Sequence, residues 1–419
     1  MTAASSNGAG VRILALTHYY PPEVNAPATR MSEHARAWTA LGHEVTIVTC
    51  APNHPTGKLY PGYRNRLWQE ETLDGVRVIR LWTWLAANAG VVSRFANFVS
   101  YFMSVLLWMW RFPRADVVLS TSPQFLCGLA GWLLKRRRRP WVLEIRDIWP
   151  ESIVATGAMR QNAIIRLLEA IEASAYRHAD LVVSVTDGFV PHIRKARPEG
   201  RILVLKNGVD LALFGSVDPR SAATFKATHH LTGKFVAAYV GTHGMAHGLD
   251  TVLDAAEKLR HRNTIAFLLV GSGAERARLQ AAATARKLDN VVMLEQQPKS
   301  EIVAILSASG AAMVLLRRSE TFKTVIPSKI FEAMALSRPI ILGVEGEARA
   351  LVEAGGAGLA ITPEDSEALA AAIERLADDP ALAERLGTSG RAFVEREFDR
   401  TRLAATYADA LQDLVDRHR

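Results

Sequence analysis

The chain has 419 residues, of which 49% are hydrophobic and 22% are charged, a composition typical of globular proteins rather than disordered or collagen-like chains. A length above the roughly 250–300 residues at which a single core stops growing predicts two domains. The two cysteines, Cys50 and Cys127, provide neither a disulfide framework nor metal-ligand spacing, and they suit a reducing compartment.

The net charge of +8 is unevenly distributed. Residues 1–210 hold 25 Lys and Arg against 16 Asp and Glu, a net charge of +9, whereas residues 211–419 hold 25 against 26, a net charge of −1. A basic half indicates contact with an anionic surface, either membrane lipid or nucleic acid. Nucleic acid is the weaker interpretation, because no recognisable nucleic-acid-binding module accompanies the charge.

The chain opens with a βαβ pattern. Residues 11–16 predict a buried strand, residues 31–41 a helix and residues 45–49 a second, parallel strand. The loop at residues 19–30 lies at the carboxyl end of the first strand, where open α/β sheets bind ligands. A proline-stiffened connector is the alternative interpretation. The polar candidates that we take from this loop are Glu23, Asn25 and Arg30.

Residues 95–110 form an uncharged run rich in Phe, Trp and Met. The run is shorter than the ~20 apolar residues that span a bilayer. It is either a helix buried within the domain or a helix in the membrane interface, with Trp108, Trp110 and Arg111 at headgroup level. The five adjacent cations at residues 135–139 favour the interface, because they suit an anionic membrane surface.

A predicted strand at residues 141–145 delivers Arg146 and Asp147 to its carboxyl edge. Asp147 can accept a proton from a hydroxyl group there, and Arg146 can hold its carboxylate or a phosphate. A structural Arg–Asp pair is the alternative. The turn at residues 207–210 coincides with the change in charge, and a domain boundary is placed just after it. The other elements predicted in this half are strands at 76–81, 181–185 and 202–205 and helices at 164–176 and 190–195.

The second half repeats the α/β alternation. A strand at residues 235–240 runs into a glycine-rich turn that begins at Gly241, and a strand at residues 266–270 runs into Gly271-Ser272-Gly273. Such a turn presents backbone N–H groups to a phosphate, although glycines can also serve only tight packing. His243 and His247 are spaced like metal ligands but have no third ligand, so no metal site is predicted. The other predicted elements are strands at 291–294, 312–316 and 340–343 and helices at 249–260, 301–306, 367–376 and 401–416.

Residues 321–334 combine a proline-preceded helix start with a cation. Pro327 cannot lie inside a helix and Ser328 is a good N-cap, so a helix is predicted from Ser328 to residue 336. Lys329 opposes the helix dipole, and a bound phosphate would compensate it. Glu332, one turn further on, can accept two hydrogen bonds from a ribose diol. The pattern predicts a nucleotide-sugar site, with a capped helix and solvated side chains as the alternative.

Several motifs of this chain together resemble glycosyltransferase family 4, the retaining, nucleotide-sugar-dependent glycosyltransferases with the GT-B fold. The resemblance covers nearly the whole chain and is greatest to the bacterial branch that builds surface polysaccharides and lipopolysaccharide O-antigen, including fucosamine transferases. The motifs are Pro21-Pro22-Glu23, Ala26-Pro27-Ala28-Thr29-Arg30, Leu41-Gly42-His43-Glu44-Val45, Arg146-Asp147-Ile148-Trp149-Pro150-Glu151-Ser152, Asn207-Gly208-Val209-Asp210, Gly241-Thr242-His243-Gly244, Gly271-Ser272-Gly273 and Pro327-Ser328-Lys329-Ile330-Phe331-Glu332-Ala333-Met334.

The resemblance implies an α/β architecture of two Rossmann-like parallel-sheet domains that face each other across a cleft. Residues 1–212 would bind the acceptor and residues 213–397 the nucleotide-sugar, while a helix in residues 398–419 would return to the first domain. Glu332 matches the second glutamate of the family's Glu-x7-Glu motif, which contacts the donor ribose. The other matched donor positions are Gly241, Thr242, His243, Gly244 and Ser328 for the diphosphate and Gly271, Gly273 and Gln297 for the base.

The chain departs from the family pattern at three places. Thr324 replaces the first glutamate of the Glu-x7-Glu motif. His243 and His247 fall near the usual diphosphate-gripping Arg and Lys, which makes Lys323 and Lys329 the candidate replacements. Arg146 replaces the histidine that often precedes the aspartate of the acceptor domain, which leaves Asp147 as the contact for the acceptor hydroxyl. Because the donor phosphate itself takes the acceptor proton in retaining members, the resemblance leaves open whether Asp147 is a base or only orients the acceptor.

The sequence contains no Asp-x-Asp pair, the usual carboxylate clamp for a metal–diphosphate complex, so we expect a metal-independent reaction without a cofactor. The expected function is transfer of an N-acetylated sugar from a UDP-sugar to a lipid-linked or saccharide acceptor, on the cytoplasmic face of the membrane. The alternatives are a UDP-sugar 2-epimerase of the same architecture and a non-catalytic binding protein, the latter because of Thr324.

Overall fold

The computed structural model describes residues 10–86, 91–122, 124–136, 139–150, 162–215 and 219–419. The chain divides into two compact units, Met1–Lys206 with Thr401–Arg419, and Asn207–Arg400. Four residues of the sequence motifs discussed above lie outside the described residues: Arg137, Arg138, Glu151 and Ser152.

The first unit is built on an eight-stranded sheet of order β3-β4-β2-β1-β5-β6-β7-β8. Every neighbouring pair is parallel except β3 and β4. The strands are β1 (Arg12–Leu16), β2 (Glu44–Cys50), β3 (Trp68–Leu73), β4 (Val76–Leu81), β5 (Val117–Thr121), β6 (Trp141–Ile145), β7 (Leu181–Ser184) and β8 (Ile202–Val204).

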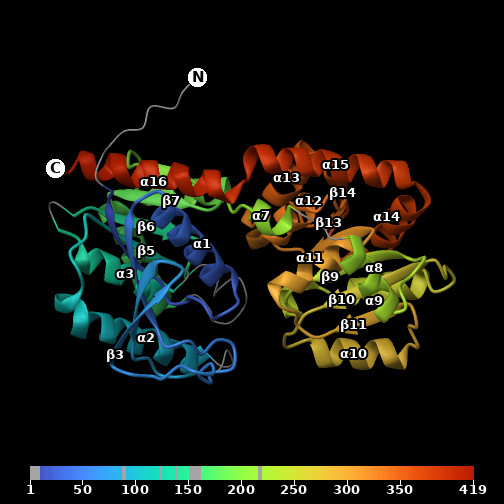
Figure 1. The fold of residues 1–419 in the computed structure, drawn as a ribbon, viewed down its shortest axis with the longest axis horizontal. Helices are drawn as coiled ribbons and strands as arrows, with labels where there is room; N and C mark the ends of the chain where they lie inside the picture. Colours follow the sequence, from blue (N-terminus) through green and yellow to red (C-terminus); the bar gives the residue numbers. More distant parts are fainter. Residues whose placement is uncertain (1–9, 87–90, 123, 137–138, 151–161, 216–218) are drawn as a thin grey trace. The chain divides into compact units, whose positions relative to one another are not determined.

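Helices cover both faces of this sheet, because alternate residues of its parallel strands point to opposite sides and both sets are apolar. The helices α1 (Ala26–Ala40) and α16 (Arg400–Asp416) pack on one face, and Figure 1 shows α16 running alongside β7 and α1. The other face carries α2 (Val91–Trp108), α3 (Phe125–Leu134), α5 (Ala163–His178) and α6 (Val190–Ala196), and the unit also has the short helices η1 (Met109–Arg111) and η2 (Asp187–Phe189).

The second unit has a wholly parallel sheet of order β11-β10-β9-β12-β13-β14. Its strands are β9 (Phe235–Val240), β10 (Ile265–Val270), β11 (Val291–Leu294), β12 (Ala311–Leu315), β13 (Ile340–Gly343) and β14 (Gly358–Ala360). One face packs on α9 (Asp250–Lys258), α10 (Arg276–Ala285) and α14 (Ser366–Asp378). The remaining helices are α7 (Leu211–Phe214), α8 (Pro219–Thr228), η3 (Met245–His247), α11 (Lys299–Ser307), η4 (Glu320–Thr324), α12 (Lys329–Ala335), α13 (Glu347–Ala354) and α15 (Pro380–Glu397).

Each sheet has one point at which the strand order reverses. In the first unit this point lies between β1 and β5, and in the second it lies between β9 and β12. A crevice forms outside the carboxyl ends of the strands at such a point, and ligands of open α/β sheets bind there. The residues that follow β9 are the Gly241 turn, so the fold places this turn at the switch point of the second unit.

The antiparallel strand β3 is absent from the sequence-based prediction. It is connected to β4 by Asp74 and Gly75, which both have positive φ (52° and 79°). Two positive-φ residues form the type of tight turn that joins antiparallel strands, and Asp-Gly is a preferred pair for it. This strand could not be recognised from the sequence, because the charged residues Glu70 and Glu71 interrupt its apolar pattern. Charged residues are common in strands at the edge of a sheet.

Candidate functional site

Two glycine turns meet at the carboxyl edge of the second unit's sheet. Gly241, Gly271 and Gly273 have φ of 144°, 146° and 153°, values that favour glycine. A Cβ on Gly271 would overlap the carbonyl oxygen of Gly241, and a Cβ on Gly273 would lie 2.5 Å from the carbonyl oxygen of His243. The His243 amide donates to the Ser272 carbonyl at 2.9 Å. The glycines therefore allow the two turns to pack backbone against backbone.

The amino group of Lys329 reaches the first of these turns. Its Nζ lies 3.9 Å from the centroid of the Tyr239 ring, and a Cβ on Gly241 would lie 2.8 Å from that nitrogen. The nitrogen is shielded from solvent and has no hydrogen-bond partner among the described residues. Burial lowers the pKa of Lys329 to about 7, and the nearby Glu332 carboxyl opposes this shift. A cation that lacks an anionic partner in this position can pair with a bound anion.

Two histidines lie beside this lysine. His243 is fully buried, and neither of its ring nitrogens has a hydrogen-bond partner in the described part of the chain. Burial lowers the pKa of His243 to about 4, with Arg276 and Lys329 adding to the effect. Burial and Lys329 likewise lower the pKa of His247 to about 4. Both rings are therefore neutral at physiological pH, so His243 offers one N–H donor rather than a charge, whereas Nδ1 of His247 lies 3.4 Å from the Leu315 carbonyl oxygen.

Ser328 lies at the N-cap position of α12, as the sequence predicts, but its side chain does not cap the helix. Ser328 has helical dihedral angles (φ −60°, ψ −26°) and makes no capping hydrogen bond. The carbonyl of Pro327 accepts from the amide of Ile330 at 3.1 Å, so a turn already encloses Ser328 before α12 begins at Lys329. Ser328 thus lies within the turn, and the helix α12 ends at Ala335 rather than at residue 336.

Glu332 and Lys323 occupy different surroundings. Glu332 is half-buried on α12, where burial raises its pKa and the ammonium groups of Lys299 and Lys329 oppose the shift. Lys323 is more open to solvent and pairs with two carboxylates, at 2.6 Å from Glu320 and 3.8 Å from Glu345. Of the two candidate lysines, Lys329 is therefore the one that approaches the glycine turns.

The remaining predicted donor positions lie on or near the same edge. Thr242 is exposed in the Gly241 turn, and its carbonyl accepts from the Tyr239 hydroxyl at 2.8 Å. Gly244 has room for a Cβ, since the nearest atoms are 3.6 Å away. Gln297 is half-buried after β11 and donates to the Glu295 carbonyl at 3.2 Å.

Sequence reasoning missed two side chains of this site. Tyr239 supplies the ring under Lys329, and Arg276 donates from Nε to the Gly271 carbonyl at 3.1 Å. Arg276 opens α10 directly after the second glycine turn, and a cation in the first helical turn is the same signal that singled out Lys329. Tyr239 could not be recognised as a site residue from the sequence, because an aromatic residue within a buried strand is expected to belong to the hydrophobic core.

In the first unit the candidates of the 19–30 loop all have structural partners. The buried Glu23 carboxylate accepts from the amides of Asn53 and His54 at 2.9 and 2.8 Å, and burial still raises its pKa to about 6. Asn25 accepts from the Ala28 amide at 2.9 Å and caps α1. These contacts fix the loop onto the rest of the unit.

Arg30 forms a buried ion pair on α1. Its Nε lies 3.2 Å from Oε1 of Glu144 on β6, and the two side chains are 5% and 0% exposed. Arg30 also donates to the carbonyl of Leu205 at 3.0 Å. The pair thus ties α1 to the centre of the sheet.

Arg146 and Asp147 lie at the carboxyl end of β6, at the edge that the sequence predicted. The Arg146 amide donates to Ser122 Oγ at 2.8 Å, and burial lowers the pKa of its guanidinium to about 10, with Glu144 opposing. Asp147 lines a small cavity together with Ser122, Trp149 and Glu172.

Two polar groups near this edge were also missed. Glu172 on α5 is buried in the wall of the Asp147 cavity and accepts from the Tyr176 hydroxyl at 2.5 Å. His18 lies two residues after β1 at the switch point, where its Nε2 lies 2.6 Å from Asn97 Oδ1 and burial lowers its pKa to about 4. The position of His18 after a buried strand was a usable signal, whereas Glu172 lies within an ordinary amphipathic helix.

Within the described residues, no group of three or more His, Cys, Asp or Glu side chains is arranged to hold a metal ion. Metal independence of the reaction stays a prediction, because the arrangement of these side chains does not test how the reaction proceeds.

Comparison with known proteins identifies two family models that together cover most of the chain. Residues 25–208 match the glycosyl transferase 4-like domain, and residues 221–393 match the glycosyl transferases group 1. The putative colanic acid biosynthesis glycosyl transferase WcaI of Escherichia coli K12 is 24% identical over 402 residues, which is 93% of this chain and 97% of that protein.

Solved structures show the same fold. The sucrose-phosphate synthase of Thermosynechococcus elongatus superimposes with a TM-score of 0.76 at 20% identity, over 97% of this chain and 100% of that one. Anabaena Alr3699/HepE, solved with UDP and glucose, superimposes with a TM-score of 0.71 at 17% identity, over 96% and 99%. The predicted α/β GT-B fold class is confirmed. The chain belongs to the GT-B glycosyltransferases, with a family 4-like domain followed by a group 1 domain.

Proposed function

We propose that this glycosyltransferase is retaining and metal-independent, and that it transfers an N-acetylated sugar from a UDP-sugar to a lipid-linked or saccharide acceptor in cell-surface polysaccharide biosynthesis. The observation that carries the proposal is the approach of the unpartnered Lys329 amino group to the Gly241 turn. The colanic acid enzyme supports the polysaccharide pathway, and the HepE complex with UDP supports the nucleotide. The 2-epimerase alternative is not favoured, since both matching families are glycosyltransferases.

The second unit would bind the donor. The amides of the Gly241 turn and the Lys329 ammonium would hold the diphosphate, because a backbone without Cβ atoms lets a phosphate approach its N–H groups. A neutral His243 would donate a further hydrogen bond. Glu332 would accept from the ribose hydroxyls, and the edge at Gly271, Gly273 and Gln297 would contact the base.

The first unit would bind the acceptor at the carboxyl end of β6. In a retaining transfer the bond between the sugar's anomeric carbon and the diphosphate oxygen breaks, and a bond to the acceptor oxygen forms on the same face. The acceptor proton passes to an oxygen of the leaving diphosphate. Asp147 would then orient the acceptor hydroxyl, from which its carboxylate can accept a hydrogen bond. Lys329 would stabilise the charge that develops on the leaving group, the role that a metal ion has in other transferases.

The helix α2 supports association with an anionic membrane surface. Its inner side is buried at Tyr101 and Val105, whereas Met103 and Leu107 on its outer side are 56% and 61% exposed. Trp110 follows at 76% exposed, and the Arg111 guanidinium lies 4.9 Å from the ring of Trp68. Of the helices in the described part of the chain, none has both the length and the hydropathy required to cross a bilayer. We propose a peripheral location on the cytoplasmic face.

A thermal-shift comparison of UDP-, GDP- and TDP-sugars tests the donor. A ligand at 100 times its Kd stabilises the protein by roughly 2.7 kcal/mol, so the UDP-sugar should give the largest shift. The Lys329→Met variant should lose most of this shift. Equal shifts for all three nucleotides would contradict the proposed UDP specificity.

Transfer is tested with radiolabelled UDP-sugars and membrane lipid, with and without EDTA. We expect transfer that is insensitive to EDTA, retains the anomeric configuration and falls in Asp147→Asn while UDP binding is unchanged. A UDP-sugar that is isomerised without an acceptor would instead favour the epimerase, and nucleotide binding without any turnover would favour a non-catalytic protein.

A further inference from the structure

A depression with a volume of about 580 Å³ opens on the first unit, away from the Asp147 edge. It is lined by the ends of α3, α5, α6 and α16 and by the loop that precedes β8. Asp180 and Arg201 lie immediately before β7 and β8, so the depression lies at the amino ends of these strands. Asp147 follows β6 at its carboxyl end. The depression is therefore at the opposite edge of the sheet from the proposed acceptor site.

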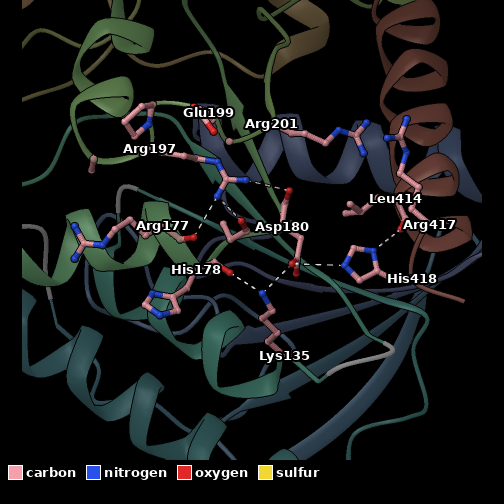
Figure 2. A pocket seen from close by; sticks show the side chains of 14 residues that line it. Lys135, Arg177, His178, Asp180, Arg197, Glu199, Arg201, Leu414, Arg417 and His418 are labelled. Carbon is pink, nitrogen blue, oxygen red and sulfur yellow. Dashed lines mark hydrogen bonds and ion pairs between the residues drawn. The ribbon is translucent and has the colours of Figure 1, made fainter.

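The lining is strongly basic. It contains Lys135, Arg177, Arg197, Arg201 and Arg417, against the carboxylates of Asp180 and Glu199. Figure 2 shows Lys135 and Arg197 pointing toward Asp180, the guanidinium groups of Arg201 and Arg417 lying near each other, and the Arg177 side chain pointing away from Asp180 at the rim. Such a gathering of cations in a concave site raises the local concentration of anions.

The acidic residue in the middle of the depression is already neutralised. The two Asp180 carboxylate oxygens each lie 2.8 Å from a donor, Lys135 Nζ and the Trp141 amide, and His418 Nε2 lies 3.6 Å from Oδ1 (Figure 2). Asp413, behind the wall, pairs with both Arg201 and Arg417 at 2.7 and 2.9 Å. Even with Asp413 included, the cations outnumber the carboxylates by five to three.

Some guanidinium donors of the wall have no partner among the described residues: those of Arg177 are open to solvent, whereas Arg197 Nε and Arg201 Nη1 are shielded from it. Arg177 is exposed and has no side-chain hydrogen bond or ion pair with the described residues. Arg197 donates to the Tyr176 and Asp180 carbonyls at 2.7 and 3.2 Å, but its Nε has no partner within the described chain, and neither has Nη1 of Arg201. Burial lowers the pKa of Arg197, and the neighbouring Arg194 adds to this effect, so an additional negative charge here would be stabilising.

We propose that this depression is a second ligand site, separate from catalysis, which binds a phosphorylated molecule. Planar guanidinium groups match the geometry of phosphate oxygens, and the apolar Ala196 offers contact to a carbon skeleton. The volume suits a ligand of sugar-phosphate or phospholipid-headgroup size. Because its walls come from α5, α16 and the loop before β8, a bound phosphate would clamp the end of α16 to the first unit.

The test uses the full chain at low ionic strength, with inorganic pyrophosphate and glycerol 3-phosphate as soluble probes in isothermal titration. Vesicles of phosphatidylcholine with or without phosphatidylglycerol form the second arm. The double variant Arg177→Gln/Arg417→Gln removes two exposed charges and should weaken binding about tenfold or more, as the loss of charged hydrogen bonds implies. Binding of the soluble probes identifies a free phosphorylated ligand, whereas binding only of phosphatidylglycerol vesicles identifies the headgroup; either supports the proposal if the double variant loses it.

The matched control is Arg260→Gln/Arg385→Gln, which makes the same change in net charge at exposed positions of the second unit. This control should change the affinity less than twofold. Binding that survives Arg177→Gln/Arg417→Gln but is lost in Lys329→Met would assign the phosphate to the glycine turns and overturn the proposal. An equal loss of affinity in both double variants would show that binding is general charge attraction, and this outcome would also overturn the proposed site. Neither result affects sugar transfer, so the proposed function is tested separately.

Discussion

Lys329 is the residue on which the proposed donor site depends most. Its folded-state pKa of about 7 lies well below its ordinary value of 10.5, because its amino group is buried over the Tyr239 ring. Between these two pH values the unfolded chain binds a proton at this residue and the folded chain does not. The contribution of Lys329 to stability is therefore unfavourable near pH 7, and it improves as the pH rises towards 10.5.

A bound diphosphate should raise the pKa of Lys329 in the folded protein, since it stabilises the charged ammonium. We expect UDP binding at pH 8–9 to take up a proton and to weaken as the pH rises above about 7. Isothermal titration in buffers of different ionisation enthalpy measures this uptake. His243 and His247 do not contribute, because they are neutral throughout this range.

The uptake should vanish in Lys329→Met and persist in Lys323→Met, whose amino group is paired with Glu320 and remains charged. Uptake that is unchanged in Lys329→Met would remove this residue from the diphosphate site.

Gly241 provides a second residue-scale prediction. Alanine there must adopt φ near 144° and place its Cβ 2.8 Å from Lys329 Nζ, so Gly241→Ala should destabilise the protein by about 1–3 kcal/mol. The control is Gly244→Ala in the same turn, where φ is −108° and the nearest atoms are 3.6 Å away. Denaturant unfolding of both variants measures the difference. Similar stabilities would show that the turn does not require a glycine at position 241.

At the scale of elements, the Arg30–Glu144 pair holds α1 on the sheet. Arg30→Met leaves a buried carboxylate, and losses of this kind reach about 3–5 kcal/mol. We expect about 3 kcal/mol here, because the guanidinium of Arg146 still compensates part of the Glu144 charge. The measurement is the free energy of unfolding in denaturant.

The double variant Arg30→Met/Glu144→Leu should recover much of this loss, because no charge is then left buried. Arg36→Met is the matched control on the same helix, since its partner Asp74 is 3.8 Å away and both are exposed. If Arg30→Met kept full stability but lost transfer activity, Arg30 would be an acceptor contact as the sequence first indicated.

Prediction from sequence succeeded where a pattern was local. The strand–glycine turns at Gly241 and Gly271 and the Arg146–Asp147 edge lie where the sequence placed them, because buried parallel strands have a continuous apolar signal. The prediction failed for the side-chain cap of Ser328, because the turn at Pro327 gives Ser328 helical dihedral angles. It also failed for β3, because only the turn after this strand has a recognisable sequence pattern. Arg30 could not be assigned, because its partner is 114 residues away.

At the scale of the whole molecule, the basic first unit and the exposed side of α2 make one prediction. Leu107→Ser/Trp110→Ser removes two apolar side chains from that side, at 61% and 76% exposed. Burial of such side chains contributes about 1.5–3 kcal/mol each, so binding to phosphatidylglycerol vesicles should fall at least tenfold. Co-sedimentation at low and high salt measures this fall and its electrostatic share.

Leu41→Ser/Met245→Ser, a control with two comparably exposed apolar residues elsewhere, should bind the vesicles like the original chain. Vesicle binding that is equally weak in both double variants would contradict a specific role for α2.

The position of α16 has a consequence for biosynthesis. Tyr407 and Leu411 of this helix fill the core beside Trp38, whose indole donates to the Ala404 carbonyl at 3.0 Å. A ribosome completes α16 only after it has translated the whole of the second unit. During synthesis the first unit therefore cannot complete its hydrophobic core until α16 has been made, and part of that core stays exposed to solvent. The second unit can complete its folding earlier. A gene cut after codon 206 should accordingly yield an insoluble product, and supplying residues 400–419 as a separate peptide should rescue it.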